Sequence, residues 1–241
     1  MLKTTLIPFA LGLLVLAGCT QKQNTLSSSE KAEGFVLLFD GQSLQGWRAY
    51  MEDPMEAAWS VQDGALVLKG GSEKGSYANI VTTGEYDDFD LRFEWKIEPG
   101  SNTGLMFHVK EGPKMPYLTG PEYQLLDDEG FRGGDGKPVP PEEYTASHYA
   151  IEAAYQEVTK PVGEWNTSRI LVVGNVVQYW LNEVKTADYE MHSEKWNKQV
   201  ADAKFGNWKT FGTTETGHLA LQDHGHGAWF RNIKIKELSK H

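Results

Sequence analysis

The chain has 241 residues, a formal net charge of −10 and one cysteine. The acidic balance argues against nucleic acid as a partner, because phosphate binding needs a basic surface. A single cysteine rules out an internal disulfide. Aromatic residues make up 12% of the chain, a share that suits strand packing and also supplies flat faces on which sugar rings stack.

The N-terminal residues predict an export signal. Lys3 precedes an apolar run over residues 6–17, which is too short to cross a bilayer, where a helix needs about 20 apolar residues. Such a run followed by small residues is typical of a secretory signal peptide. Residues 16–19 read Leu-Ala-Gly-Cys and resemble the bacterial lipobox, although an ordinary signal peptide could also contain a cysteine. We therefore predict a signal peptide over residues 1–18 and a lipid anchor on Cys19.

The position after the anchor bears on location. Thr20 follows Cys19 where an inner-membrane retention signal would be acidic, so we expect the outer membrane. Residues 19–33 are polar and rich in serine, and they are predicted to form a flexible tether. Residues 34–241 then form one domain, whose length of roughly 200 residues suits a single all-β domain.

Many short stretches of this domain alternate with a period of two or form brief apolar runs, and clusters of Gly, Asn, Asp and Pro separate them. This pattern is typical of an all-β sandwich or barrel. Residues 193–204 are the best helical candidate, and two long loops at 127–143 and 188–211 are expected to rim one face or end. The expected strands cover residues 65–68, 89–97, 104–109, 122–126, 169–173, 176–181, 218–222 and 229–235.

Two of these strands carry polar residues on one face. The strand over residues 89–97 alternates between an apolar face and a charged face. Glu94 and Lys96 lie on the charged face, which is either solvated surface or the floor of a binding groove. In the following strand the same alternation places Asn102 and His108 on the polar side.

Two later segments add further candidates. Glu122 and Gln124 share one face of strand 122–126, and Gln222 and His224 share the outward face of the stretch 218–226. The histidines of that stretch invite a metal interpretation, but their spacing matches no structural zinc pattern and no cysteine accompanies them. A divalent metal ion held by Glu122 and His224 stays open as an alternative.

A family resemblance runs along the domain. Residues 37–47 read Leu-Leu-Phe-Asp-Gly-Gln-Ser-Leu-Gln-Gly-Trp, which closely resembles the LFDG-x-x-L-x-GW opening of the 3-keto-disaccharide hydrolase domain family. Each further match is weak alone, but together they are specific and follow the family's usual order over nearly the whole domain. They are Asn102-Thr103-Gly104, Glu122 with Gln124 and Asp127, and residues 163–166, 180–182, 221–225 and 230–233.

The resemblance implies a fold and an activity. The expected fold is a two-sheet antiparallel jelly-roll sandwich of the concanavalin A-like lectin/glucanase type, with a concave sugar-binding face. The expected activity is cleavage of glycosides that are already oxidised at C3. The sequence departs from the family where a small apolar stretch is expected, because residues 145–149 include His148 and Glu152 follows. These two residues are expected to alter the groove and therefore the substrate.

A direct retaining glycosidase is disfavoured. That mechanism needs two carboxyl groups about 5 Å apart. In glucanases of the fold that the resemblance implies, a Glu-x-Asp-x-Glu strand places the acids on one face. The corresponding positions here are Glu122, Gln124 and Leu126, so two of the three acids are missing.

A 3-keto sugar offers an easier route, because the ketone acidifies the C2 proton. A base removes that proton, the enolate oxygen is stabilised, and an acid assists the leaving group at C1. Glu122 and His224 are the candidates for base and acid, or for ligands of a cation, and His108 comes next. The residues expected to bind the substrate are Asn102, Gln124, Gln222 and Arg231, which would hold sugar hydroxyls or the carbonyl, together with Glu94 and Lys96 on the charged face of strand 89–97.

The alternative from another class is a non-catalytic, lectin-like carbohydrate-binding module. Its charged groups would only form hydrogen bonds with hydroxyls. The gathering of His and Glu side chains on the predicted polar face favours the enzyme, because binding modules more often use exposed aromatic rings and amides.

Overall fold

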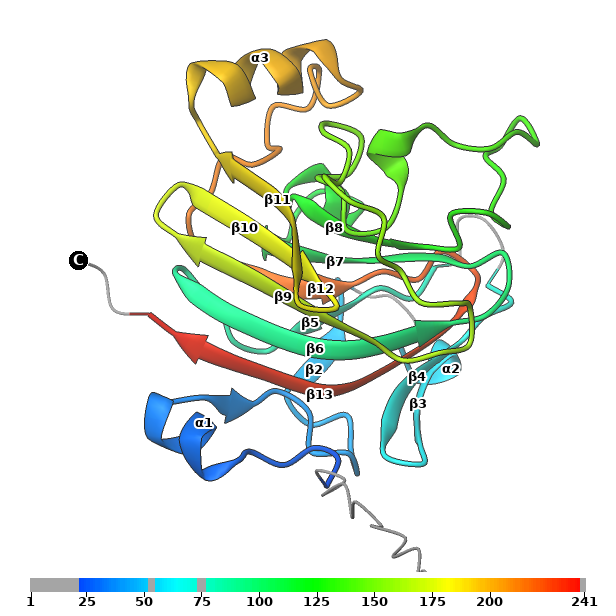
Figure 1. Cartoon of the computed structure of the whole chain (residues 1–241), viewed down its shortest axis with the longest axis vertical. Helices are drawn as coiled ribbons and strands as arrows, with labels where there is room; N and C mark the ends of the chain where they lie inside the picture. The colour runs from blue at the N-terminus through cyan, green and yellow to red at the C-terminus, as the bar shows by residue number, and fades with distance from the viewer. Residues whose placement is uncertain (1–21, 52–54, 73–76, 239–241) are drawn as a thin grey trace, which may run out of the picture.

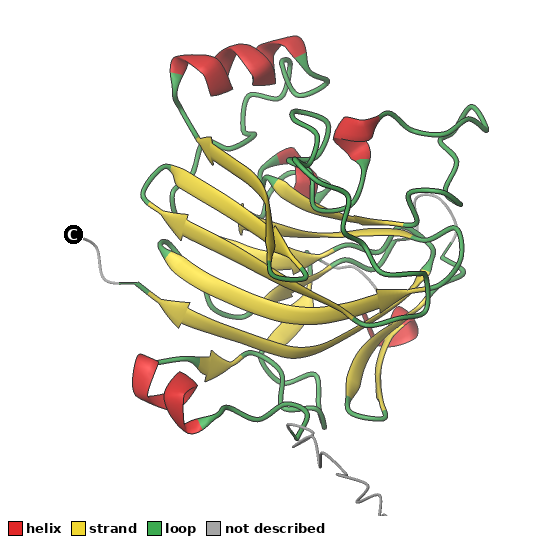
Figure 2. Ribbon diagram, viewed as in Figure 1, coloured by secondary structure: helices red, strands yellow, loops and turns green. Residues whose placement is uncertain are grey.

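The computed structural model describes residues 22–51, 55–72 and 77–238. Two antiparallel sheets pack face to face, and short helices lie at the periphery (Figures 1 and 2). The predicted all-β, two-sheet sandwich is confirmed. The predicted signal peptide and Cys19 lie outside the described residues. Within the described part of the chain, no helix is long and apolar enough to cross a membrane.

The larger sheet has eight strands, and seven of them follow the order β11-β10-β9-β6-β13-β4-β3. The remaining strand, β1, pairs with the C-terminal part of β13, whereas the N-terminal part of β13 pairs with β4. The strands of this sheet are β1 (Val36–Leu37), β3 (Trp59–Gln62), β4 (Ala65–Lys69), β6 (Phe89–Ile97), β9 (Asn166–Val173), β10 (Val176–Leu181), β11 (Val184–Glu190) and β13 (Gly227–Glu237).

The smaller sheet has five strands in the order β2-β5-β12-β7-β8. Its two faces differ in what covers them. One face packs on the larger sheet and forms the core, and the other face, which we call the outer face, carries the candidate site. The strands are β2 (Trp47–Ala49), β5 (Ile80–Thr82), β7 (Asn102–Val109), β8 (Glu122–Leu126) and β12 (His218–Leu221).

The core follows from strand alternation. The apolar residues of β6 that the sequence pattern assigns to one face are all buried, and Phe93 packs edge-on against Tyr123 of β8, with ring centroids 5.9 Å apart. This contact joins the two sheets, so Tyr123 and Leu125 face the core. Because side chains alternate along a strand, Glu122 must face outward.

The helices are short. They are α1 (Ser28–Glu33), α2 (Met55–Ala58), α3 (Glu194–Asp202) and the 3-10 turns η1 (Pro116–Leu118) and η2 (Pro141–Glu143). α1 lies beside β13, and α3 lies beyond β11 at the opposite edge of the larger sheet (Figure 1). The Ser193 side chain caps α3 by accepting a hydrogen bond from the Trp196 N–H. The helix predicted over residues 193–204 is therefore confirmed.

The predicted tether is wrong for the part that the structure describes. α1 begins with a capping box in which Ser27 and Glu30 satisfy each other's backbone N–H groups. Glu30 also forms an ion pair with Lys234 of β13. Asn24 and Asn232 exchange backbone-to-side-chain hydrogen bonds in both directions, and the Asn24 amide donates to the Gly64 carbonyl at 2.7 Å. Composition suggested a tether, but these contacts fasten the segment to the larger sheet.

Candidate functional site

A cavity of about 300 Å³ opens on the outer face of the smaller sheet. Strand β8, strand β7, the turn after β12 and the loop after α3 all contribute to its wall. Four of its residues were predicted from the sequence. The lining residues are Asn102, Tyr117, Glu122, Tyr149, Lys204, Phe205, Trp208, Gln222 and His224.

Glu122 is the buried acid of this cavity. Glu122 is only 5% exposed, and its carboxylate accepts no hydrogen bond from the residues that the structure describes. Burial raises the pKa of Glu122 to about 8, and the charge of Lys204 opposes that rise only in part. A carboxyl group that faces a cavity without a protein partner is available to a ligand.

Gly104 makes room for this carboxyl group. β7 pairs with β8 so that Gly104 lies opposite Gln124. A Cβ atom at position 104 would lie 1.8 Å from Oε1 of Glu122, which no real structure tolerates. Only glycine fits at this position of the Asn102-Thr103-Gly104 motif, because the Glu122 side chain occupies the space that any other side chain would need.

Lys204 supplies the cation. Its side chain is 41% exposed and reaches the rim of the cavity from the loop after α3. The ammonium lies 3.9 Å from the ring centroid of Tyr149 and 3.8 Å from the Glu143 carboxylate. Partial burial lowers the pKa of Lys204, whereas Glu143 and Glu122 oppose that change. Lys204 therefore interacts electrostatically with both Glu143 and Glu122.

Aromatic side chains form the side wall. Tyr117 and Trp208 lie with ring centroids 5.6 Å apart, and Phe205 stacks on Phe211 at 4.2 Å. Burial raises the pKa of Tyr149 far above its ordinary value. These rings give the cavity apolar faces beside its charged groups, a combination that suits a sugar ring.

Polar atoms on the opposite side of β7 are left without partners. The Gln222 Oε1 and His224 Nδ1 atoms are buried and form no hydrogen bond within the described structure. Tyr77 stacks on the His224 ring at 5.7 Å. Burial lowers the pKa of His224, and neighbouring His226 lowers it further. Buried polar atoms normally have partners, so these two atoms are further candidates for contact with a ligand.

Asp223 holds the turn that carries His224. It is fully buried, and its carboxylate accepts hydrogen bonds from the Ser72 hydroxyl at 2.6 Å, the Ala78 N–H at 2.9 Å and the Gly225 N–H at 2.8 Å. The turn is therefore fixed from inside the protein and not by its ligand.

The predicted metal pair lacks companions. Across the described residues, no three His, Cys, Asp or Glu side chains come together in a way that could hold a metal ion. Glu122 and His224 line the same cavity, but no third ligand of these types joins them within the described chain. A metal requirement stays a prediction.

The structure brings together Asn102, Glu122, Gln222 and His224. Gln124 is buried beside them in β8, where its Oε1 accepts a hydrogen bond from the Leu125 N–H at 3.2 Å. Its side chain does not line the cavity.

His108 does not face the cavity, contrary to the expected alternation. Its backbone is left-handed, with a φ of 53°, and the pairing of β7 with β12 shifts at this end. The His108 ring packs edge-on against Phe89 and Phe107, so it lies on the core side. Val109 takes the outer position in its place. This local backbone irregularity exchanges the faces that His108 and Val109 occupy, and the sequence pattern does not predict it.

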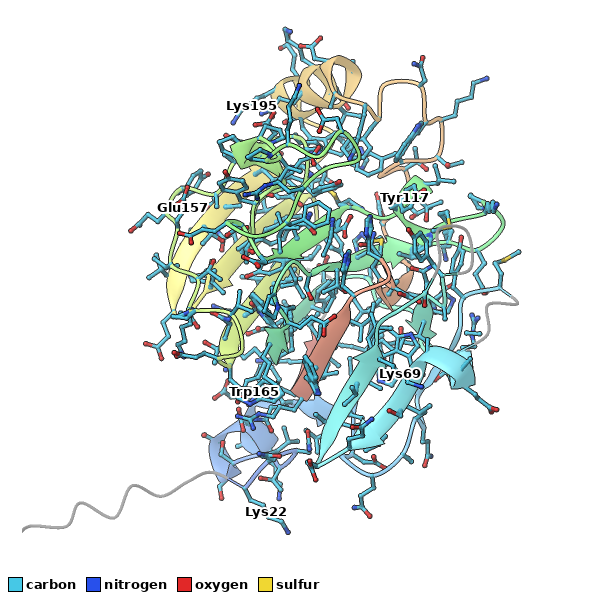
Figure 3. The ribbon with its side chains drawn as sticks, turned by 90° about the vertical axis from the view of Figure 1, so that its right-hand side faces the viewer. Lys22, Lys69, Tyr117, Glu157, Trp165 and Lys195 are labelled. Carbon is cyan, nitrogen blue, oxygen red and sulfur yellow. The ribbon has the colours of Figure 1, made fainter. Side chains whose placement is uncertain are left out.

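Glu94, Lys96 and Arg231 belong to the other sheet. Arg231 forms an ion pair with Glu94 at 2.8 Å, and the Lys96 ammonium lies over the rings of Trp165 and Trp229. Figure 3 shows Trp165 well away from Tyr117, which marks the cavity. The prediction that these three side chains share a site with Glu122 is wrong. Strand alternation predicts which residues of a strand face away from the core, but it does not predict which of the two sheets the strand joins.

His148 and Glu152 also miss the cavity. His148 is buried with its ring stacked on Tyr189 at 3.8 Å, and Glu152 pairs with Lys195. Their expected influence on the groove is therefore not direct, since it is the neighbouring Tyr149 that lines the cavity.

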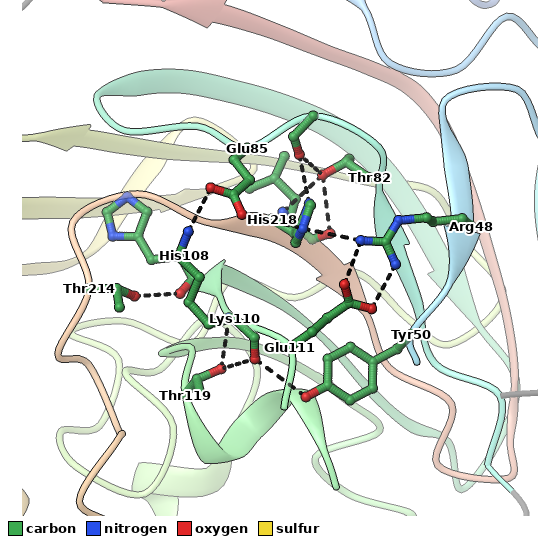
Figure 4. Close-up of polar contacts among 12 residues, drawn as sticks. Arg48, Tyr50, Thr82, Glu85, His108, Lys110, Glu111, Thr119, Thr214 and His218 are labelled. Carbon is green, nitrogen blue, oxygen red and sulfur yellow. Dashed lines mark hydrogen bonds and ion pairs between the residues drawn. The ribbon is translucent and has the colours of Figure 1, made fainter. Parts of the chain in front are cut away.

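His218 serves a separate polar cluster at the opposite end of β12 (Figure 4). Arg48 forms two hydrogen bonds of 2.7 Å with Glu111, and its Nη2 atom lies 3.2 Å from His218 Nε2. His218 Nδ1 lies 2.9 Å from the Gly84 carbonyl oxygen. These groups satisfy one another and join β2 to β12, so the cluster stabilises the sheet.

Five lining residues escaped the sequence analysis: Tyr117, Tyr149, Lys204, Phe205 and Trp208. A signal existed for some of them. The polar loop at 188–211 contains Trp208, and long loops disproportionately carry binding residues. Tyr149 ends the stretch where the sequence departs from the family.

Known proteins resemble this chain over most of its length. The model of the 3-keto-alpha-glucoside-1,2-lyase-like domain family matches residues 34–236. A 3-keto-disaccharide hydrolase of Bacteroides thetaiotaomicron is 27% identical in an alignment 245 positions long, which covers 90% of this chain and 83% of that protein.

Solved structures are similar as well. The crystal structure of a candidate glycosyl hydrolase from Parabacteroides distasonis superposes with a TM-score of 0.83 at 36% identity, covering 90% of this chain and 100% of the other. A second candidate glycosyl hydrolase from the same organism has a TM-score of 0.63 at 26% identity and covers 85% and 99% of the two chains.

Proposed function

Because this chain belongs to the family of 3-keto-alpha-glucoside-1,2-lyase-like domains, we propose that it cleaves the glycosidic bond of 3-keto-glycosides, including 3-keto-disaccharides. The family and the relatives named as hydrolases make it a glycoside-cleaving enzyme. The observation that carries the finer proposal is Glu122, a buried carboxyl group without a protein partner that faces a cavity of about 300 Å³.

The reaction begins at C2. The C2–H bond breaks, the proton goes to the Glu122 carboxylate, and the bond's electron pair forms a C2=C3 double bond while the C3 carbonyl pair moves to its oxygen. The carbonyl then re-forms, a C1=C2 double bond forms, and the C1–O bond breaks with its pair on the departing oxygen. Water adds across C1=C2 in a last step, which places a hydroxyl on C1 and a proton on C2, and the net reaction is hydrolysis.

The cavity offers a group for each role. Glu122 is the base, and its raised pKa makes its ionised form a stronger base than an ordinary carboxylate. His224 lies in the turn after β12, two strands from Glu122. Because burial lowers the pKa of His224, its ring is neutral when Glu122 is ionised, and it assists the departing oxygen by donating a hydrogen bond from a ring N–H while that oxygen takes its proton from water. Asn102 and Gln222 hold sugar hydroxyls, since the unpartnered Gln222 Oε1 is an acceptor in need of a donor.

Incubation of the purified protein with a 3-keto-glucoside and with its unoxidised parent, each with and without EDTA, tests the proposal by chromatography. We expect cleavage of the keto form only. Cleavage of the parent would instead establish a direct glycosidase. Binding of either sugar without cleavage would identify a lectin-like module, and loss of cleavage with EDTA would place a metal ion in the reaction.

The protein is also proposed to be an exported lipoprotein of the outer membrane, anchored through Cys19. The sequence of residues 16–19 supports this location. A domain that meets its substrate outside the cytoplasm would act on sugars that another enzyme has already oxidised at C3.

A further inference from the structure

Enolisation places negative charge on the oxygen at C3, and Glu122 cannot neutralise that charge because it only takes the C2 proton. C2 and C3 are bonded neighbours, so the group that stabilises the oxygen has to stand next to the base. A preorganised donor aimed at developing charge is usually the largest single contribution to catalysis.

Lys204 is the one lysine or arginine among the described residues that line the cavity. Its charge acts on Glu122, and the charge of Glu122 acts on Lys204 in return. The two groups come from different parts of the fold, β8 and the loop after α3. The cavity therefore places a cation beside its buried acid.

The ammonium has two contacts within the protein. The Glu143 carboxylate lies 3.8 Å away, and the Tyr149 ring centroid lies 3.9 Å away. Phe205 follows Lys204 in the chain and is buried in a stack with Phe211, with ring centroids 4.2 Å apart. A lysine without such contacts would lose much side-chain freedom on meeting a substrate, and here part of that freedom is already lost.

We propose that Lys204 is a further catalytic residue, whose ammonium donates a hydrogen bond to the oxygen of the sugar's C3 carbonyl and stabilises the enolate. This inference rests on the proposed function. No electron pair passes to Lys204: its N–H bonds stay intact, while the carbonyl pair moves to oxygen as the C2 proton reaches Glu122. When the C1–O bond breaks, the pair returns to the carbonyl and the hydrogen bond weakens again.

Proton exchange separates this role from binding. The 3-ketone of 1,5-anhydroglucitol has two hydrogens and no aglycone at C1, so it can enolise but has no glycosidic bond to break. Loss of its C2 proton signal in D₂O, followed by NMR, measures enolisation alone. Cleavage of a 3-keto-glucoside measures the complete reaction. Both are measured for the wild type, Lys204→Gln, Lys204→Arg and the control Lys209→Gln, which removes an exposed charge from the same loop.

We expect Lys204→Gln to slow exchange and kcat for cleavage by the same factor, about 10²–10³, as when an oxyanion-hole donor is removed. KM should change only a few-fold, Lys204→Arg should recover part of both rates, and Lys209→Gln should match the wild type. Thermal melting should show all variants folded.

Two results overturn the inference in different ways. Unchanged exchange in Lys204→Gln, or a loss confined to KM, would make Lys204 a binding residue only and leave the proposed function intact. Wild-type protein that neither exchanges nor cleaves would overturn the proposed function, and this inference with it.

Discussion

Burial gives Glu122 its chemical character. Sheet alternation turns the side chain outward, Gly104 leaves space for it, and the surrounding residues leave it only 5% exposed. An ordinary surface glutamate is a weak base because its pKa lies far below neutral pH. Here burial raises the pKa to about 8, so the residue is mostly protonated at pH 7 and becomes a strong base as the pH rises.

The pH dependence of catalysis follows from this pKa. We expect kcat/KM for a 3-keto-glucoside to rise with pH, to reach half of its maximum near pH 8 and to level off above that pH, because Glu122 is half ionised at its pKa of about 8. Glu122→Gln should lower kcat by about 10²–10⁴-fold, the usual contribution of a general base. Rate measurements over the range from about pH 5 to about pH 9 check both points, with exposed Glu129→Gln as the control. Wild-type turnover in Glu122→Gln would remove Glu122 from the mechanism.

The same pKa predicts a cost in stability. Between the ordinary pKa of 4.5 and about 8, folded Glu122 keeps a proton that the unfolded chain has released. Rising pH therefore favours unfolding in this range. At about 1.36 kcal/mol for each pKa unit, the loss is on the order of 3–5 kcal/mol. The free energy of unfolding of Glu122→Gln should exceed that of the wild type increasingly as the pH rises through this range.

Urea unfolding at a series of pH values measures this difference. Glu129→Gln, which removes an exposed carboxylate, should show no comparable trend. A constant difference between Glu122→Gln and the wild type would mean that Glu122 does not lose its proton over this range in the folded protein.

At the scale of single elements, β7 and β8 act as a pair that shapes the site. Gly104→Ala would push a methyl group into the Glu122 carboxyl, because the nearest contact would be 1.8 Å. We expect kcat/KM to fall at least about 10-fold and stability to fall by about 1–3 kcal/mol, as in other overpacked sites. Gly134→Ala is the control, since nothing lies within 4 Å of a Cβ atom there. Kinetics and thermal melting that are unchanged in Gly104→Ala would contradict the steric argument.

The turn after β12 depends on Asp223. Asp223→Ala would leave the N–H groups of Ala78 and Gly225 without their acceptor, and a buried unpaired group costs about 1–3 kcal/mol. His224 would lose its fixed position, so kcat should fall together with stability. Asp223→Asn keeps one acceptor oxygen and should be milder in both measurements. Equal activity in Asp223→Ala and the wild type would show that the turn holds its shape without this carboxylate.

Sequence periodicity predicted the long strands well and the short ones poorly. The strands 89–97, 122–126 and 176–181 match the structure residue for residue. The strands β1, β2, β3 and β5 have two to four residues each, too few for a period to show. β11 was hidden in a segment that reads as polar, because only some of its residues are buried.

The site was recovered in part for a related reason. Alternation predicts that Glu122 and Glu94 each leave the core, but only long-range pairing decides which sheet each strand joins. The positive φ of His108 is another property of the folded chain that alternation cannot anticipate. Lys204 lies more than 80 positions from Glu122, so only the fold brings the cation to the acid.

For the whole molecule, the two sheets divide the work. The larger sheet holds the N-terminal segment through Asn232 and Lys234, and the smaller sheet holds the cavity on its outer face. The segment that follows the proposed anchor and the candidate active site are thus built on different sheets of one sandwich.

The anchor itself can be tested in cells. The full chain expressed in a Gram-negative host should incorporate a labelled fatty acid and fractionate with the outer membrane, because Cys19 is the only cysteine available for acylation. Cys19→Ser should abolish the label and release the protein from the membrane. Labelling that persists in Cys19→Ser would contradict the predicted anchor.

The two hydrogen bonds between Asn24 and Asn232 limit the distance between an acylated Cys19 and the domain. Asn24 lies five positions after Cys19, and a fully extended chain of that length spans at most about 18 Å. A domain held so closely would rest almost against the lipid headgroups and could neither tumble freely nor reach far into the surrounding fluid. If Cys19 carries the proposed lipid, catalysis would be confined to a thin layer at the membrane surface.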